Sequence, residues 1–312
     1  MVIKPIWHNA QHRLKLIILG MLLMISGIFS LLLGYLIANI GFDINLLSSP
    51  NLITSLDDPN TINALKTIQL VQQIGIFIVP ALLFALLCST SPLIYLRIKN
   101  RPKTFSLIAS IIIMIFSIPL INFLAGINES MRLPEFLSGL ENWMMEAEAN
   151  AKVITTAFLN MDGRKDLVIN MVIIALIPAI GEELLFRGAL QNLVIDWSKN
   201  IHLGIWITAI LFSAMHMQFY GFLPRMAMGL LFGYLVIWTG SIWIPVFCHF
   251  TNNGSAVLYT YLNQRGIISE ELDSVGTGNG DLTYIIVSSL IILILLVFVF
   301  RNKQTPPPTI VA

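Results

Sequence analysis

Charge is scarce in this 312-residue chain. It contains 18 Lys and Arg, 17 Asp and Glu and 5 His, so charged residues make up only 11% of the sequence while hydrophobic residues make up 56%. Soluble proteins carry about 25% charged residues. The few charged residues of this chain could not cover the surface of a globular protein of this size. The sequence therefore predicts an integral membrane protein with the lipid bilayer as its surroundings.

An excess of positive charge and paired cysteines are also missing. The net charge is +1 and the sequence pI is about 7.8, which leaves no broad basic face and excludes a nucleic-acid partner. Cys88 and Cys248 both lie in apolar stretches, and no Cys-x-x-Cys pair is present. We expect both thiols to be packing residues rather than a disulfide.

Long apolar runs are what the chain has in abundance. Runs such as 111–116 are apolar on all sides, whereas strands of a membrane barrel would alternate apolar and polar residues. The sequence predicts an all-α, polytopic transmembrane bundle of about eight helices. The expected spans are 14–40, 68–88, 105–126, 167–190, 203–217, 226–239, 242–262 and 282–300.

Basic residues mark one side of this bundle. They precede the first span and follow the second and the last, and eight crossings place all three groups on the same side: Lys4, Arg13 and Lys15; Arg97, Lys99, Arg101 and Lys103; Arg301 and Lys303. The positive-inside tendency predicts a multi-pass protein of a bacterial plasma membrane with both termini in the cytoplasm. We divide the chain into N-terminal helices with an interfacial connection (1–166), a core (167–262), and a last helix with a disordered tail (263–312).

The long connection before the fourth span predicts an amphipathic helix. Its apolar residues recur at three- and four-residue steps, at positions 137, 140, 144, 147, 151, 154 and 158. Two placements remain open, because the helix could lie at the membrane interface or pack against its own bundle. Its acidic polar face favours neither strongly.

Five ionisable residues stand inside the expected spans, where a charge costs roughly 2.5 kcal/mol or more. They are Glu182, Glu183, Arg187, His216 and His249. Arg225 begins the sixth span, and we expect it to extend towards an interface.

The fourth span separates its two glutamates. Glu183 and Arg187 are one helical turn apart and predict a structural ion pair, whereas Glu182 points about 100° away. We interpret Glu182 as the working carboxylate. The alternative is that both glutamates belong to one ion network.

The remaining polar groups fit a hydrolytic site. Glu182 could take a proton from a water molecule that His216 positions, while His249 and Asn253 could donate hydrogen bonds to a developing oxyanion. A serine mechanism is less favoured, since no Gly-x-Ser-x-Gly is present and Ser213 has no evident base. Zinc on Glu182, His216 and His249 stays open, although no His-Glu-x-x-His motif supports it, and we favour a site without cofactor.

Together these residues resemble the motif set of the CPBP intramembrane protease family, also called the Abi or CAAX prenyl endopeptidase family. The motifs are Glu182-Glu183-x-x-x-Arg187, Phe212-x-x-x-His216 and His249-x-x-x-Asn253, in order on successive apolar helices. The resemblance implies an endopeptidase that acts on a membrane-associated or lipidated protein or peptide. It assigns water activation to Glu182 and His216 and the oxyanion site to His249 and Asn253, and family members are often labelled metalloproteases.

One geometric problem and two other functions remain. Counted along the expected spans, Glu182 lies nearer the cytoplasmic end and His216 nearer the outer end. Either the fourth helix continues past Leu190 towards Trp197, which we favour, or the fifth breaks near 218–224. The other functions are a non-enzymatic bacteriocin-immunity or scaffold protein of the same family, and a transporter with a proton relay.

Overall fold

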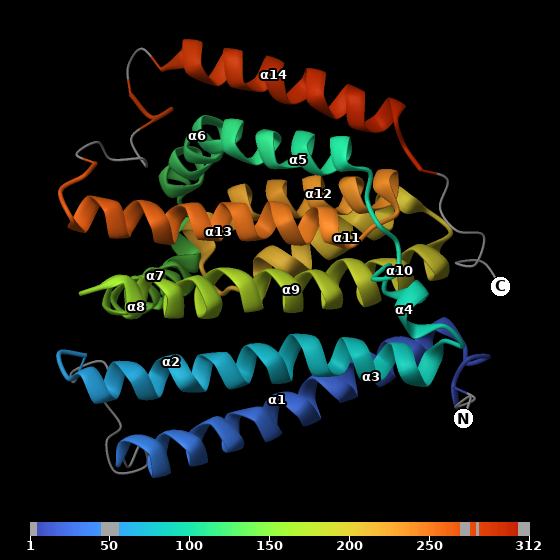
Figure 1. Cartoon of the computed structure of the whole chain (residues 1–312), viewed down its shortest axis with the longest axis horizontal. Coiled ribbons are helices and arrows are strands. Elements are labelled where there is room, and N and C mark those ends of the chain that lie inside the picture. Colours follow the sequence, from blue (N-terminus) through green and yellow to red (C-terminus); the bar gives the residue numbers. More distant parts are fainter. Residues whose placement is uncertain (1–4, 45–55, 269–274, 279–280, 305–312) are drawn as a thin grey trace.

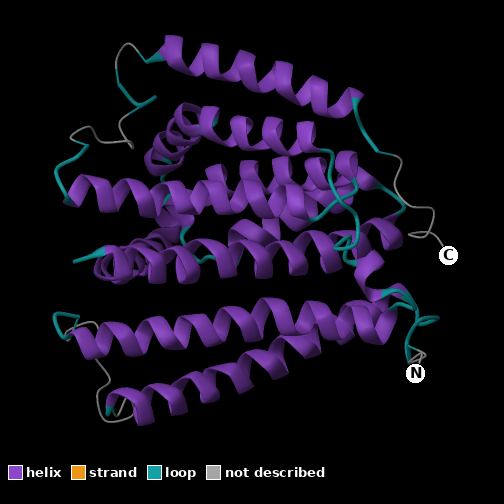
Figure 2. Cartoon of the chain, in the orientation of Figure 1, coloured by secondary structure: helices purple, strands orange, loops and turns teal. Residues whose placement is uncertain are grey.

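Helices form nearly all of the structure, a computed structural model that describes residues 5–44, 56–268, 275–278 and 281–304. Those residues contain no strand, as Figure 2 shows. The all-helical fold class is therefore confirmed.

The described elements follow in chain order. They are α1 (His12–Phe42), α2 (Pro59–Gln73), η2 (Ile74–Ile78), α3 (Val79–Cys88), α4 (Pro92–Tyr95), α5 (Thr104–Phe116), α6 (Ile118–Ser130), η3 (Glu135–Leu137), α7 (Ser138–Leu159), α8 (Arg164–Asn170), η4 (Met171–Leu176), α9 (Ile177–Glu183), η5 (Leu184–Leu190), α10 (Gln191–Ser198), α11 (Ile201–Ala214), η6 (Phe219–Gly221), α12 (Phe222–Thr239), α13 (Trp243–Gln264) and α14 (Leu282–Arg301).

Every expected apolar span is helical. By length and composition, five described helices could cross a membrane, or six if the pair α5 and α6, bent by 46°, is one span. Figure 1 shows the long helices side by side, with α1 and α14 at opposite edges of the bundle. The start of α1 and the end of α14 lie at the same end of the bundle, as an even number of crossings requires. Which side of the membrane this end faces stays a prediction.

The fourth span resolves the problem of depth. It is continuous from Arg164 to Ser198, 35 residues, because three α-helical stretches are joined through the π-helical turns η4 and η5. Lys199 in the left-handed region ends it, and Asn200 caps the 14-residue helix α11 directly afterwards. Both helices are measured from the turn that joins them. Glu182 lies about 24 Å along the fourth span and the end of α11 lies about 21 Å along its own axis, so Glu182 and the residues that follow α11 are at a similar depth.

The amphipathic helix is present as α7 and packs against its own bundle. Six of the seven predicted apolar positions are buried or half-buried, Leu140 being the exposed one at 46%. The helix contacts α2, α13 and η6, and Trp143 lies 5.5 Å from Phe219 between ring centroids. Of the two placements the sequence left open, the structure has the one on the bundle.

Two glycines bring α12 close to α11 and the fourth span. A Cβ added at Gly229 would lie 3.1 Å from the Cα of Ala209, and one at Gly233 would lie 2.8 Å from Oε1 of Gln191. The same glycines accept side-chain hydrogen bonds through their carbonyl oxygens, Gly229 from Arg187 (3.3 Å) and Gly233 from Gln191 (3.2 Å). Small residues at this contact therefore let polar side chains of one helix satisfy the backbone of another inside the bundle.

The loop after α4 joins α10 and α12 through Arg97. Arg97 is 2% exposed, and its guanidinium donates to Oδ1 of Asn192 (3.3 Å) and to the carbonyl of Val236 (3.4 Å). Burial lowers the pKa of Arg97 to about 10, so it remains a cation at neutral pH. It ties the loop after α4 to both α10 and α12.

Replacing Gly229 by Ala should destabilise the fold. The added methyl meets backbone atoms of α11, so the helices must separate, at a cost of about 1–3 kcal/mol. Thermal unfolding of the purified protein measures the loss. Gly126→Ala in α6 is the control, because nothing lies within 4 Å of its added Cβ. Equal melting temperatures for the two variants would contradict the close-contact argument.

Candidate active site

The fourth span brings its motif to the middle of the bundle through close packing on the second span. A Cβ on Gly181 would lie 3.0 Å from Cβ of Phe77, so only glycine permits this approach without a shift. The π-helical turn η5 begins directly after Glu183, and such turns occur often at functional sites. Glu182 and Glu183 are 5% and 0% exposed.

Glu183 and Arg187 form the ion pair that their spacing predicts. Nη1 of Arg187 donates to Oε1 of Glu183 at 3.1 Å, and Nη2 donates to the carbonyl of Gly229. Three rings surround the guanidinium, those of Phe186, Phe212 and Phe232, with the Phe212 centroid 4.4 Å from Cζ. Aromatic faces stabilise a cation, so this buried charge has both an anion and a cage.

His249 joins the same network. Its Nδ1 lies 2.9 Å from Oε1 of Glu183, so the carboxylate holds both Arg187 and the imidazole. Phe232 stacks on the imidazole at 5.8 Å between centroids and fixes its plane. We predicted that Glu183 forms an ion pair with Arg187 alone. In the structure Glu183 also orients His249.

His216 reaches the site from a different element. It lies two residues beyond Ala214, the last residue of α11, and its Nδ1 lies 2.8 Å from the carbonyl of Phe212. A carbonyl only accepts, so Nδ1 is assigned the hydrogen and Nε2 faces the site. The side chain is 30% exposed, against 6% for His249 and 6% for Glu182.

Glu182 is the point at which the two imidazoles converge. Its Oε2 lies 3.9 Å from Nε2 of His216 and 3.9 Å from Nε2 of His249. This oxygen is buried and has no hydrogen-bond partner among the residues that the structure describes. A separation of 3.9 Å is too long for a direct hydrogen bond, but one water molecule about 2.8 Å from each atom would bridge it. The site thus has a place for a water molecule that donates to Glu182.

His249 lies between the two carboxylates of the motif, with Nδ1 2.9 Å from Oε1 of Glu183 and Nε2 3.9 Å from Oε2 of Glu182. The imidazole therefore connects the buried ion pair to the carboxylate beside the cavity.

A cavity of about 400 Å³ opens beside these groups. His216, His249, Asn252, Asn253 and Arg225 line it, together with apolar residues of α6, α7 and α12. This volume suits a small ligand or a few residues of a peptide.

Asn253 lies in the cavity wall, but its carboxamide is already engaged. Its Nδ2 donates to the carbonyl of Ile174 at 3.1 Å, and its Oδ1 accepts from Nδ2 of Asn252. One N–H of Asn253 remains for a ligand. The structure places Asn253 in the same cavity as His249 without a hydrogen bond between them.

Hydrogen bonds place two further residues of the sequence analysis. Arg225 is half-buried and lines the cavity, and its Nη1 and Nη2 donate to the side chain and the backbone carbonyl of Gln218. Its position relative to a membrane interface stays a prediction. Ser213 is 1% exposed and its hydroxyl donates to the carbonyl of Phe222 at 2.7 Å, in agreement with the expectation that it has no base.

The donor set does not fit a zinc ion as placed. Zinc bonds of about 2.0–2.1 Å to nitrogen and oxygen bring tetrahedral donors to roughly 3.3 Å from one another. Oε2 of Glu182 lies 3.9 Å from Nε2 of His216 and from Nε2 of His249, farther than this, and no group of three or more His, Cys, Asp or Glu among the described residues is arranged to hold a metal ion.

Sequence reasoning missed Phe232 and Arg225 as parts of the site. Phe232 carries no signal of its own, since an apolar residue in an apolar helix is indistinguishable from packing. Arg225 does carry one: a cation only a few residues from the motif histidine, on a short turn.

Comparison with known proteins finds a family match in part of the chain. Residues 164–255 match the Rce1-like family, described as type II CAAX prenyl endopeptidase, which confirms the resemblance seen in the motifs. The chain is also 31% identical over 85 residues to the uncharacterized protein YpbD of Bacillus subtilis (strain 168). That match covers 26% of this chain and 40% of the relative's length. No solved structure matches.

Removing the buried cation of Arg187 should lower the free energy of unfolding more than removing a surface charge does. Arg187→Met keeps much of the volume but leaves Glu183 buried without its cation, at a cost of about 3–5 kcal/mol. The control, Arg132→Met, breaks the pair of Arg132, whose side chain is 64% exposed, with Glu141 (3.7 Å), for which we expect a loss of less than about 1 kcal/mol. Melting temperatures compare them, and the double variant Glu183→Gln/Arg187→Met should recover part of the loss. An Arg187→Met protein as stable as the control would refute the pairing argument.

Proposed function

We propose that this integral membrane protein is an endopeptidase of the CAAX-protease type, which hydrolyses a peptide bond of a membrane-associated or lipidated protein. The observation that carries the proposal is the convergence of His216 and His249 on the buried, unpartnered oxygen of Glu182, beside a cavity. The match of residues 164–255 to the Rce1-like family supports it.

Water is the nucleophile in this proposal. It lies between Oε2 of Glu182 and Nε2 of His216, and donates a hydrogen bond to each. As its oxygen attacks the carbonyl carbon of the scissile bond, the proton passes to Glu182. Glu182 then gives this proton to the leaving nitrogen and the C–N bond breaks, which yields a carboxylic acid and an amine. The second hydrogen of the water, now on the acid, passes to the amine, so that the products leave as a carboxylate and an ammonium group.

His249 and Asn253 stabilise the oxyanion that forms after attack. His249 donates from Nε2 in this proposal, while its Nδ1 stays on Glu183. Asn253 contributes the N–H that Ile174 leaves free. Hydrogen bonds to Glu183 and to the carbonyl of Ile174 hold the two donors in place, so little reorganisation accompanies the development of charge.

Glu182→Gln should abolish cleavage while leaving the fold intact. The amide has the same size and stays neutral in a buried position, but it cannot accept the proton, so we expect kcat to fall at least about 100-fold. The assay uses purified protein and a membrane-tethered peptide reporter. The kcat of His216→Gln and of His249→Gln should also fall. Glu146, exposed on α7, provides the control, and the kcat of Glu146→Gln should match that of the wild type.

The outcomes of this assay separate the candidate functions. Wild-type cleavage by the Glu182→Gln protein would rule out the mechanism. If the wild type itself cleaves no tethered or lipidated reporter, a non-enzymatic immunity or scaffold role becomes the better account.

Chelation should leave the activity in place. Because Glu182 and the imidazoles activate water without a metal in our proposal, dialysis against a strong chelator should change the rate less than about twofold, within ordinary assay scatter. Metal analysis of the active sample is the companion measurement. Loss of activity that only an added divalent ion restores would reverse the assignment and make Glu182, His216 and His249 ligands.

A further inference from the structure

Arg225 is a cation at the catalytic cavity that makes no ion pair within 4.0 Å with a described carboxylate. It lines the cavity together with His216 and His249. Glu148 of α7 attracts it from farther away. Its Nε is buried and has no hydrogen-bond partner among the described residues. A partly buried charge left in this state is costly unless a ligand completes it.

The chain holds this guanidinium in a fixed place. Nη1 and Nη2 both donate to Gln218, and the group lies flat against the bare α-carbon of Gly221, where an added Cβ would meet Nη1 at 2.6 Å and Cζ at 2.8 Å. The φ of Gly221 is −109°, a value open to any residue. Glycine is therefore needed here for space, not for backbone conformation.

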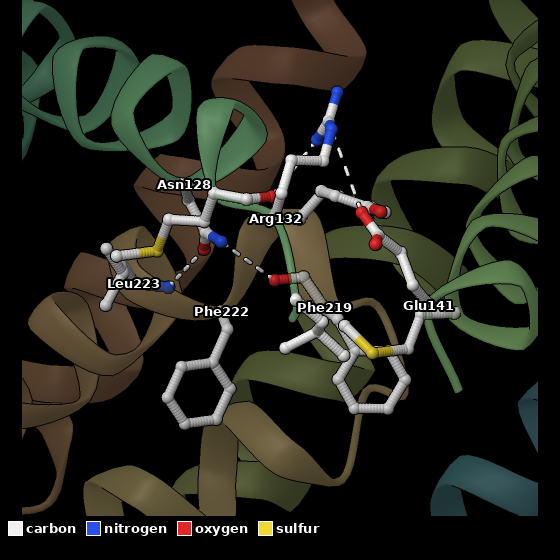
Figure 3. Close-up of a pocket in the computed structure, with 10 residues that line it drawn as sticks. Asn128, Arg132, Glu141, Phe219, Phe222 and Leu223 are labelled. Carbon is white, nitrogen blue, oxygen red and sulfur yellow. Dashed lines mark hydrogen bonds and ion pairs between the residues drawn. The ribbon is translucent and has the colours of Figure 1, made fainter. Parts of the chain in front are cut away.

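A neighbouring side chain fixes the turn that carries these residues. Asn128 of α6 donates to the carbonyl of Phe219 (3.0 Å) and accepts from the N–H of Leu223 (2.7 Å). Figure 3 shows its carboxamide between the two, in the wall of a second pocket of about 210 Å³ on the other side of the turn. Arg132 and Glu141 close that pocket and do not line the catalytic cavity. Asn128 thus holds the turn through hydrogen bonds on the side of the second pocket, while Arg225 lines the catalytic cavity.

We propose that Arg225 is a specificity-determining residue, which binds a carboxylate of the substrate in the wall of the catalytic cavity. The guanidinium matches the two oxygens of a carboxylate, and the N–H groups of Nη1 and Nη2 that Gln218 does not use are available to it. The carboxylate comes either from the free C-terminus of the peptide or from an acidic side chain near the scissile bond. This inference rests on the proposed function, because it concerns the same cavity.

Four tethered peptides distinguish these two sources. They combine a free or amidated C-terminus with Asp or Asn just after the scissile bond, and each is cleaved by the purified full chain. We expect KM to be at least about tenfold lower for one of the acids than for its neutral counterpart, as a charge-assisted hydrogen bond provides. Selectivity for the C-terminal acid or for Asp identifies the source, and equal KM values for all four peptides overturn the inference.

Variants show whether Arg225 is responsible. In Arg225→Gln the ratio of KM between neutral and acidic peptides should fall to near one, and Arg225→Lys should give an intermediate ratio because it keeps the charge without the fork. Gly221→Ala keeps the charge but displaces the guanidinium, so it too should reduce the ratio. Arg132→Gln, whose side chain is 64% exposed, should keep the wild-type ratio. An unaltered ratio in folded Arg225→Gln protein overturns the assignment.

A binding measurement keeps this inference separate from the proposed function. A labelled, non-hydrolysable reduced-amide analogue of each peptide is titrated with wild-type and Arg225→Gln protein. Tenfold tighter binding of an acidic analogue to the wild type alone supports the carboxylate site, even if no peptide is cleaved. Equal affinities overturn it, even if every peptide is cleaved.

Discussion

The shared carboxylate of Glu183 is the interaction on which the site depends. It is fully buried, and it binds Arg187 and His249 with the same oxygen. Taking one carboxylate and one guanidinium out of water is repaid only when further partners satisfy them. The rings of Phe212 and Phe232 and the carbonyl of Gly229 supply those partners, which explains why so many apolar residues of α11 and α12 are placed around two charges.

Glycine makes this arrangement geometrically accessible. Gly229 has to be bare for α12 to approach α11, and the same close approach presents its carbonyl to Arg187. Gly181 serves the opposite face of the fourth span, where Phe77 packs directly on it. The polar network and the helix packing therefore depend on each other, since a shift of either helix would leave a buried charge without a partner.

Local features of the site follow from the sequence because helix periodicity is local. The one-turn spacing of Glu183 and Arg187 and the extension of the fourth helix towards Trp197 could both be predicted, and the shared depth of Glu182 and His216 follows from that extension together with the short α11. What could not be predicted depends on contacts between distant segments. The bond from His249 to Glu183 joins residues 66 apart, and the inward position of Arg225 depends on how Asn128 pins a turn that it does not border in sequence.

The two halves of the chain divide the surroundings of Glu182 between them. On the side of the second span, Phe77 and Phe186 pack with their rings 6.5 Å apart and close the site with apolar groups. On the other side, α6, α7, α12 and α13 line the cavity, with Thr155 and Leu159 of α7 among its walls. The cavity therefore lies on the side of α7, the helix that the long connection supplies. On the opposite side, Phe77 and Ile78 of the second span pack against Gly181, which keeps lipid and water from the back of the neighbouring carboxylate and the local dielectric low.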